Sequence, residues 1–404
     1  MRIVAFLPGA TVPGAAPGAA ADEAAPGAVA AGVTPGAAAA AAVPLVGFLL
    51  SDGPGDPGRI VPLAALADPR LGPAALDPSM AALDLRGLLR ADPGLRRTEA
   101  ALDAAVTAGP RPPCLGLDEV HLAAPVPDPG KIVCVGHNYA AHVREQNLPL
   151  PDRPMLFAKF ANAVVGDGEP VVRHAGTHAL DLEAELAVIV GARMRRTAPA
   201  DALAHVAGYT VANDISARDL QGSKPALAPG EHGDGQWLRA KGSDTFCPLG
   251  PVMVTPSEAG DPGAMRVRSW RVPAAGADAS QGTAGADASA IDPGGADAEA
   301  RQGAGAPILM QDARTDDMVF DVAHLLSFIS QAITLEPGDV VLTGTPGGVG
   351  VFRDPPVFLE PGDVVVVEVE GIGRLANPIV AADGSVPSGS PAASLLACDR
   401  PAVP

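Results

Sequence analysis

Short apolar runs separated by glycine and proline recur along the chain, a pattern typical of β-rich proteins. In the first part of the chain, this pattern predicts strands at 1–7, 45–50 and 59–62. Apolar residues at helical spacing follow at 78–108 and predict helical structure there. We interpret residues 1–125 as a small β-rich N-terminal domain.

From residue 131 onward the apolar runs become richer in valine, isoleucine and leucine. They predict strands at 131–136, 186–190, 208–214, 248–254, 340–344 and 364–371. One long helical pattern occurs late, at 321–334. Because so few helices separate the strands, a doubly wound parallel sheet is disfavoured. The predicted fold class is mainly β with some α, with a larger β-dominated domain over 126–380.

Three segments contain too few large apolar side chains to fold on their own. Residues 8–44 are a Pro/Gly/Ala tract between two predicted strands, and we interpret them as a low-complexity insertion. Residues 273–306 contain the repeated sequence GADAS/GADAE and form a second such insertion. Residues 381–404 are predicted to be a disordered tail.

Charge excludes some classes of partner. The net charge of −18 and the lack of a Lys/Arg cluster argue against nucleic acid and against anionic membrane surfaces. Residues 25–50 carry no charge, but Pro26, Pro35 and Pro44 would break a helix that crossed a membrane. We therefore predict that the protein binds neither nucleic acid nor membranes.

The cysteine positions bear on the compartment. No CxxC pair occurs among the four cysteines, which fits neither a zinc site nor a disulfide scaffold. We therefore predict that the cysteines are reduced thiols and that the protein is cytoplasmic. The cysteines are Cys114, Cys134, Cys247 and Cys398.

Two carboxylates are predicted to lie side by side in the sequence DLEAEL, residues 181–186. In a strand, Glu183 and Glu185 would share one face while their apolar neighbours pack into the core. Buried together, they would repel each other unless a cation lay between them. Asp214, at the end of another apolar run, adds a third carboxylate. Such an all-oxygen set suits Mg²⁺ or Mn²⁺ and a chelating 2-oxo acid substrate.

A candidate base and several candidate substrate ligands complete the set. His142 and Glu145 are spaced i, i+3, so that on a helical turn the carboxylate would orient the imidazole as a general base. His137 has no comparable partner in the sequence and is predicted to be structural. Lys241, Arg218 and Gln221 are candidates for binding a substrate carboxylate or an enolate oxygen.

The sequence TGTPGGVG at 343–350 is a glycine-rich turn after a predicted strand. Its backbone N–H groups, including that of Gly344, and the hydroxyl of Thr345 could cradle an anion. It lacks the Lys-Ser/Thr pair of a phosphate-binding P-loop.

Taken in order, these segments resemble the fumarylacetoacetate hydrolase family. The resemblance covers about 130–380 and rests on KIVCVGHNYAAH, FAKF, DLEAELAVIVG, GYTVANDISARDLQ, KGSDTF, LEPGDVVLTGTPGGVG and GIGRLANPI. It implies a mixed β-roll catalytic domain, usually homodimeric, with one divalent cation per subunit. It also implies metal ligands at Glu183, Glu185 and Asp214, a His–Glu pair at His142 and Glu145, a catalytic lysine at Lys241 and a substrate-binding threonine at Thr345.

One departure from the family pattern concerns 273–306, where the repeat replaces an Asn-Gly-Glu hairpin while Gln311 still fits. We expect the repeat to loop out without contacting the metal. Because the repeat replaces the hairpin, the edge of the sheet at this point, and the dimer contact there, are expected to differ from the family pattern.

The resemblance implies a hydrolase or decarboxylase of 2-oxo and 2,4-dioxo acids. In the hypothesis that follows from it, His142 activates water against an acylpyruvate, and Lys241 stabilises the pyruvate enolate. The alternatives are an isomerase or hydratase of 2-hydroxydienoates in aromatic catabolism, of the 2-hydroxyhepta-2,4-diene-1,7-dioate isomerase type, and an ureidoglycolate-type lyase. A metal-binding assembly protein is the non-enzymatic alternative.

Overall fold

The structure is a computed structural model that describes residues 1–8, 44–51, 56, 58–107, 112–227, 235–274 and 305–397. Most of both predicted insertions, 9–43 and 275–304, lies outside the described residues. The described part is dominated by strands with some helices, so the predicted fold class, mainly β with some α, is confirmed.

Twelve strands of the described residues form one long sheet, antiparallel for most of its length. Its strand order is β4-β3-β2-β1-β14-β12-β11-β17-β6-β7, with β5 beside β1 and β8 beside β14. The bounds are β1 Arg2–Pro8, β2 Leu45–Leu50, β3 Arg59–Pro62, β4 Leu115–Gly116, β5 Val120–Ala123, β6 Ile132–Gly136, β7 Met155–Lys159, β8 Val164–Val165, β11 Ala184–Val190, β12 Val206–Asn213, β14 Cys247–Val254 and β17 Val340–Leu342.

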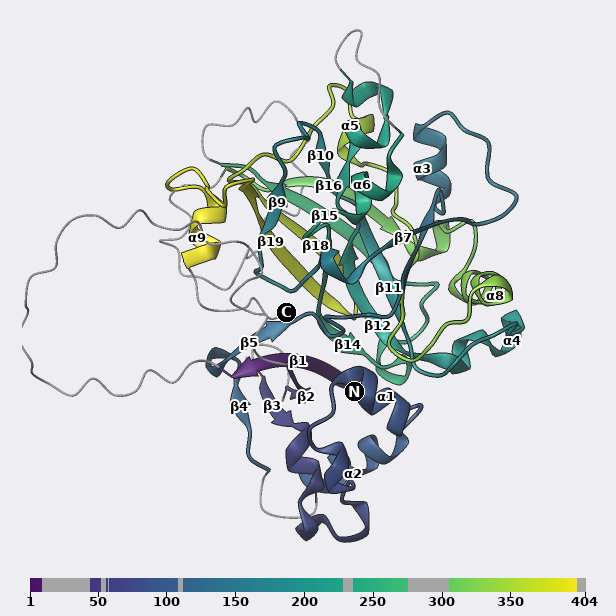
Figure 1. Cartoon of the computed structure of the whole chain (residues 1–404), viewed down its shortest axis with the longest axis vertical. Helices are drawn as coiled ribbons and strands as arrows, with labels where there is room; N and C mark the ends of the chain where they lie inside the picture. Colours follow the sequence, from purple (N-terminus) through teal and green to yellow (C-terminus); the bar gives the residue numbers. More distant parts are fainter. Residues whose placement is uncertain are drawn as a thin grey trace, which may run out of the picture.

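The N-terminal strands continue this sheet. Strand β1 pairs with β2 on one side and, through Arg2 and Ile3, with β14 on the other. Helices α1 (Leu85–Ala91) and α2 (Arg96–Thr107) lie at the end of the molecule opposite α5 (Arg218–Gln221) and α6 (Trp237–Gly242) (Figure 1). The three predicted N-terminal strands are confirmed, whereas the domain boundary near 125 stays a prediction because one sheet runs across it.

A second sheet of five strands packs against the first. Strand β18 is buried on both faces, because Val365 and Val367 pack toward the main core while Val364 and Val366 face a smaller cluster with Trp270. This explains why its sequence, VVVVEV, is apolar without alternation. The strands, in spatial order, are β16 Ile308–Arg314, β15 Arg266–Val272, β18 Val364–Val369, β19 Gly373–Ala381 and β9 Val171–Arg173.

The remaining helices are short, apart from α8. Helix α8 begins where the Asp321 side chain accepts a hydrogen bond from the His324 N–H, which satisfies a free N-terminal amide. The bounds are α3 Ala140–Glu145, α4 Pro199–Ala202, α7 Pro256–Ala259, α8 Val322–Ala332 and α9 Pro391–Ala397.

The prediction of a disordered tail over 381–404 is wrong for 381–397. Strand β19 reaches Ala381, and helix α9 packs Ala392 and Leu395 against the cluster around Trp270. The Ser390 hydroxyl accepts a hydrogen bond from the Ala393 N–H at the start of that helix. Small residues suffice here because the sheet face supplies the large apolar partners; residues 398–404 lie outside the described residues.

The strands that flank 275–304 remain paired. Strand β15 is antiparallel to β16 with Arg271 opposite Ile308, and the Gly305 N–H donates to the Pro273 carbonyl. The sheet is therefore continuous up to both ends of the repeat.

Asp167 carries a stability prediction. Its carboxyl group is buried, and burial raises its pKa from 3.8 to about 7 although the Ala376 and Gly168 N–H groups work in the opposite direction. Since the pKa is higher in the folded state, the folded state binds more protons between about pH 4 and pH 7, and stability falls as pH rises through that window. The shift corresponds to about 4 kcal/mol.

We therefore expect Asp167→Asn to raise the free energy of unfolding at pH 8 and to flatten its pH dependence, as measured by urea titration at pH 5 and pH 8. Asp363→Asn is the control, because it breaks a buried ion pair with Arg271 (2.7 Å) and should destabilise the protein at both pH values. An Asp167→Asn variant that loses equal stability at both pH values would contradict the expectation.

Candidate active site

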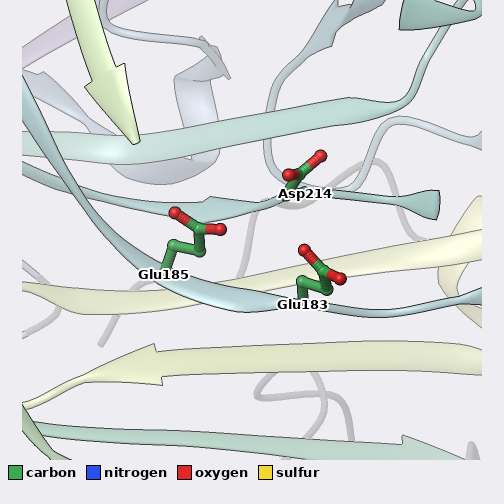
Figure 2. A group of neighbouring side chains, drawn as sticks. All are labelled: Glu183, Glu185 and Asp214. Carbon is green, nitrogen blue, oxygen red and sulfur yellow. The ribbon is translucent and has the colours of Figure 1, made fainter. Parts of the chain in front are cut away.

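Strand pairing brings the three predicted carboxylates together. Strands β11 and β12 pair with Ala184 opposite Asn213, and the same register carried one residue further sets Glu183 opposite Asp214. The Asp214 N–H donates to the Glu183 carbonyl at 2.9 Å. The carboxylate oxygens of Glu183, Glu185 and Asp214 can all lie within 4.8 Å of one another, and Figure 2 shows the groups around a common space.

The predicted strand over DLEAEL is interrupted. Asp181 belongs to β10 (Leu180–Asp181), and Glu183 lies between that strand and β11. The Glu183 N–H donates to the Asn213 side chain at 3.0 Å instead of to a strand partner. Leu182, Ala184 and Leu186 are nevertheless buried in the core, as the alternation predicted.

The buried acidic side chains of the site outnumber the cationic ones by one. Three cationic side chains contact three acidic ones: Arg218 lies 2.8 Å from Asp181, Lys241 2.8 Å from Glu183, and Lys159 2.6 Å from Asp214. Glu185 is a fourth buried carboxyl group and accepts a hydrogen bond from the Gly344 N–H at 2.6 Å. Burial, Asp214 and Glu183 raise the pKa of Glu185 well above its usual range.

The donor set therefore fits a divalent cation. Three buried carboxylates offer hard oxygen ligands, and a cation among them would remove the repulsion that raises the pKa of Glu185. Lys241 and Arg218 outweigh burial at Glu183 and hold its pKa below its usual range, so that Glu183 is ionised.

Lys241 is buried between two of these acids. Its Nζ lies 2.8 Å from Glu183 Oε2, from Asp214 Oδ2 and from the Ser216 hydroxyl. Burial works against the charged lysine, but Asp214 and Glu183 outweigh it and raise the pKa. Lys241 is therefore an ammonium group at neutral pH, and its three N–H donors are engaged by the two carboxylates and the Ser216 hydroxyl.

Arg218 is fixed by neighbours on three sides. Its Nε donates to Asp181 at 2.8 Å, its Nη1 donates to Gln221 at 3.0 Å, and its Nη2 lies 2.7 Å from Glu183. Asp181 also accepts from the Gly350 N–H (2.8 Å), and so joins the guanidinium to the glycine-rich turn.

Helix α3 presents the predicted His–Glu pair. His142 Nδ1 lies 2.6 Å from Glu145 Oε1, and Glu145 Oε2 accepts from the Gly348 N–H at 2.8 Å. With the carboxylate accepting a hydrogen bond from Nδ1–H, the favoured imidazole tautomer has its lone pair on Nε2. The pair can thus move a proton at Nε2.

The glycine-rich turn uses its polar groups within the protein. The Gly344 N–H donates to Glu185, and the Thr345 hydroxyl donates to the Ala184 carbonyl at 3.1 Å and accepts from Gln311 Nε2 at 2.7 Å. In this arrangement Gly344 positions a carboxylate, and the Gln311 amide holds the turn against β11. Their predicted role as substrate ligands stays a prediction.

A cavity of about 290 Å³ connects these groups. Of the predicted residues, it is lined by His142, Glu183, Arg218, Gln221, Lys241 and Thr345. The other predicted residues do not line the cavity. Glu145 contacts His142, Asp214 contacts Lys241, and Glu185 is clustered with Glu183 and accepts from Gly344. Phe157 and Trp237, in edge-to-face contact at 5.6 Å, form an aromatic part of the wall.

Sequence reasoning missed two of the charged residues around the site. Lys159 is fully buried, and its Nζ contacts Asp214 together with the carbonyls of Ile215, Lys241 and Phe246. A lysine in the apolar run FAKF was the available signal. Asp181 stands in the same motif as the glutamates, but only the fold shows that it contacts Arg218.

The sequence matches the family "Fumarylacetoacetate (FAA) hydrolase C-terminal" over residues 131–380. The oxaloacetate tautomerase FAHD2B, mitochondrial, of Bos taurus is 42% identical over 268 residues, which are 66% of this chain and 72% of that protein. Such relatives are named for enzymatic activities, which supports the prediction of an enzyme.

Two solved structures match larger parts of the chain. A fumarylacetoacetate hydrolase from Exiguobacterium antarcticum has a TM-score of 0.56 and 31% identity, covering 84% of this chain and 95% of its own. A 5-carboxymethyl-2-hydroxymuconate delta-isomerase from Mycobacterium smegmatis has a TM-score of 0.54 and 29% identity, with the same coverage. These relatives are named as a tautomerase, a hydrolase and an isomerase, so the family match leaves the reaction open.

Proposed function

The chain belongs to the fumarylacetoacetate hydrolase family, and from that premise we propose that it forms the enol or enolate of small 2-oxo acids in a divalent-cation-dependent reaction. Oxaloacetate is the first proposed substrate, through keto–enol tautomerisation or decarboxylation, because the 42% identical relative is named an oxaloacetate tautomerase. The observation that carries the proposal is the arrangement of three buried carboxylates, Lys241 and the His142–Glu145 pair around one cavity.

Glu183, Glu185 and Asp214 would hold Mg²⁺ or Mn²⁺, one per subunit, which would supply Lewis acidity and a chelating site for the oxo acid. Lys241 would donate to the oxygen that becomes negative as the enolate forms, in exchange for one of its three hydrogen bonds within the protein. His142 moves the proton at Nε2, while Glu145 fixes its tautomer through Nδ1. Arg218, Gln221 and Thr345 would bind the rest of the substrate from the cavity wall.

C–C bond hydrolysis of acylpyruvates is the second proposed reaction. It is favoured by the 31% identical relative that is named a fumarylacetoacetate hydrolase. His142 Nε2 could take the proton of an attacking water, and Lys241 would again stabilise the pyruvate enolate that leaves.

The test is turnover of oxaloacetate and acetylpyruvate, followed by ultraviolet absorbance with Mg²⁺, with Mn²⁺ and with EDTA. We expect metal-dependent turnover that falls at least about 100-fold in EDTA, because the carboxylates repel one another without a cation. The ratio of the two rates would distinguish decarboxylation and tautomerisation from hydrolysis. No turnover of either acid would overturn the proposal in favour of a dienoate isomerase.

Location and assembly stay predictions. Among the helices of the described residues, none has both the length and the apolar composition that crossing a bilayer requires. The Bos taurus relative is named as mitochondrial. For this chain a cytoplasmic location and a homodimer are the proposals.

A further inference from the structure

We propose that Asp317 is a positioning residue, whose side chain fixes the N-terminal end of α3 and so holds the His142 imidazole in the cavity wall. This inference rests on the proposed function, because it concerns the proton transfer at His142. Asp317 does not line the cavity. It would therefore act through α3 and not on the substrate.

Helix α3 depends on other segments for its position. It has six residues, whereas an isolated helix shorter than about 12–15 residues is only marginally stable in water. Of its side chains, only those of His142 and Val143 are buried. The chain that follows, at 147–150, is exposed and gives the helix little support. The polar contacts at its two ends therefore decide where α3 lies.

At the N-terminal end, Asp317 Oδ2 accepts a hydrogen bond from the Ala141 N–H at 2.8 Å. This N–H is one of the free amides at the start of a helix, and the N-cap residue, Tyr139, supplies no side-chain acceptor for them. Asp317 thus serves as a cap from 176 positions away, and its negative charge suits a helix N-terminus. Arg144 Nη2 lies 3.6 Å from Asp317 Oδ1, but this exposed pair contributes little.

The C-terminal end of α3 is fixed by its own carboxylate. Glu145 accepts from the Gly348 N–H at 2.8 Å through one oxygen, and its other oxygen contacts His142. This contact orients the imidazole relative to the helix, whereas the contact of Asp317 with Ala141 holds the residue directly before His142. The two carboxylates therefore have separate functions.

Asp317 lies on a segment that is itself fixed. The buried Thr315 hydroxyl accepts from the Met265 N–H at 2.9 Å, and the Thr315 N–H donates to the Met265 carbonyl at the same distance. Beyond Asp317, the Val319 N–H donates to the Asn138 carbonyl at 2.7 Å. The segment is therefore held both at the start of β15 and at the end of β6, and it can act as a rigid support for α3.

Loss of this support should affect one step of the reaction more than the others. Proton transfer requires the donor and acceptor atoms to be in hydrogen-bond reach, so a small displacement of His142 lowers its rate. The carboxylates predicted to hold the cation lie on or beside β11 and β12, away from α3. Metal binding, and a decarboxylation that needs no proton transfer at His142, should therefore change little.

The experiment compares Asp317→Ala with the wild-type protein. The kcat for acetylpyruvate hydrolysis, or for oxaloacetate tautomerisation, should fall about 10-fold, as expected for the loss of one helix cap. Decarboxylation and calorimetric Mg²⁺ affinity should stay within about 3-fold. Asp317→Asn retains an oxygen that can accept from Ala141 and should restore kcat to within about 3-fold of the wild type.

A double variant tests whether Asp317 acts through His142. In a His142→Ala background, Asp317→Ala should cause no further loss of the proton-transfer reaction, because the group that it positions is absent. A further 10-fold loss in that background would contradict the proposal.

Asp321→Ala is the matched control. Asp321 lies on the same segment and caps α8 by accepting from the His324 N–H at 2.7 Å. Its replacement removes the same kind of cap but leaves α3 untouched, so all rates should stay within about 3-fold. The proposal fails if Asp317→Ala leaves proton transfer unchanged, if it slows decarboxylation equally, or if Asp321→Ala causes the same loss.

Hydrogen exchange separates this proposal from the proposed function. In Asp317→Ala, the amides of 139–147 should exchange about 5–10-fold faster, as followed by mass spectrometry, and in Asp321→Ala they should not. If the wild type turns over neither acid, the proposed function fails while this measurement still decides whether Asp317 holds α3. Unchanged exchange in Asp317→Ala would overturn the proposal on its own.

Discussion

Glu185→Gln is expected to make the metal-free protein more stable than the wild type while removing its ability to bind Mg²⁺ and to turn over 2-oxo acids. The other three buried acids of the site each contact a cationic side chain. Glu185 is the fourth acid, and it has no such ion pair among the described residues. Burial and the neighbouring acids raise its pKa in the folded state, so its ionisation destabilises the fold increasingly as pH rises. Glutamine keeps the shape and can still accept from the Gly344 N–H.

The measurements are the melting temperature at pH 8, with EDTA and with Mg²⁺, and Mg²⁺ affinity by calorimetry. In EDTA the variant should melt higher than the wild type, and added Mg²⁺ should no longer raise its melting temperature. Affinity should fall by at least the roughly 10–100-fold that loss of an outer-shell partner costs. Turnover of oxaloacetate should be lost with it.

Glu183→Gln is the matched control, with the opposite expected sign in the metal-free protein. Glu183 contacts both Lys241 and Arg218, so its neutralisation leaves two buried cations short of a partner and should cost about 3 kcal/mol. Glu183→Ala should likewise lose all activity. A Glu185→Gln variant that melts lower in EDTA, as Glu183→Gln is expected to do, would contradict the charge balance argued for this site.

The shared side of Glu183 and Glu185 could be predicted because side chains alternate regularly along an extended chain. Asp214 was predicted as a third carboxylate at the end of an apolar run, and the pairing of β11 with β12, which the structure shows, brings it beside them. The i, i+3 spacing gave the contact of His142 with Glu145 for the same reason. Local periodicity therefore accounts for the contacts between residues that are close in sequence, such as Glu183 with Glu185 and His142 with Glu145.

The rest depends on contacts between distant segments. Lys159 comes from β7 and donates to the carbonyls of Ile215 after β12, Lys241 within α6 and Phe246 after α6, and no local pattern predicts these contacts. The use of Gly344 as a donor to Glu185 depends on β17 lying beside β11. Helix α9 was missed because its small residues resemble the low-complexity segments, and only the apolar face of the second sheet around Trp270 gives the helix a surface to pack against.

The positive φ of His137 could not be predicted either. In sequence, it is a polar residue between a strand and a helix, which is an ordinary place for a loop histidine. The next residue, Asn138, donates to the Phe320 and Thr343 carbonyls, 182 and 205 positions away, and no local pattern predicts those contacts.

His142→Ala is expected to separate the reactions that need proton transfer from the one that does not. Hydrolysis of acetylpyruvate requires a base for the attacking water, and tautomerisation of oxaloacetate requires removal of a proton from C3. Both should fall about 10²–10⁴-fold. Decarboxylation breaks a C–C bond with the loss of CO₂ and needs only a group that stabilises the enolate, so it should fall less than about 10-fold.

Calorimetric Mg²⁺ affinity is the control, because His142 is not one of the three clustered carboxylates and its replacement should leave that affinity within about 3-fold. Glu145→Gln should give an intermediate loss in hydrolysis, since an amide in place of the carboxylate leaves His142 in position without fixing its tautomer. Equal losses of hydrolysis and decarboxylation in His142→Ala would show that the imidazole acts on a step common to both, such as substrate binding, and would remove the division of labour between His142 and Lys241.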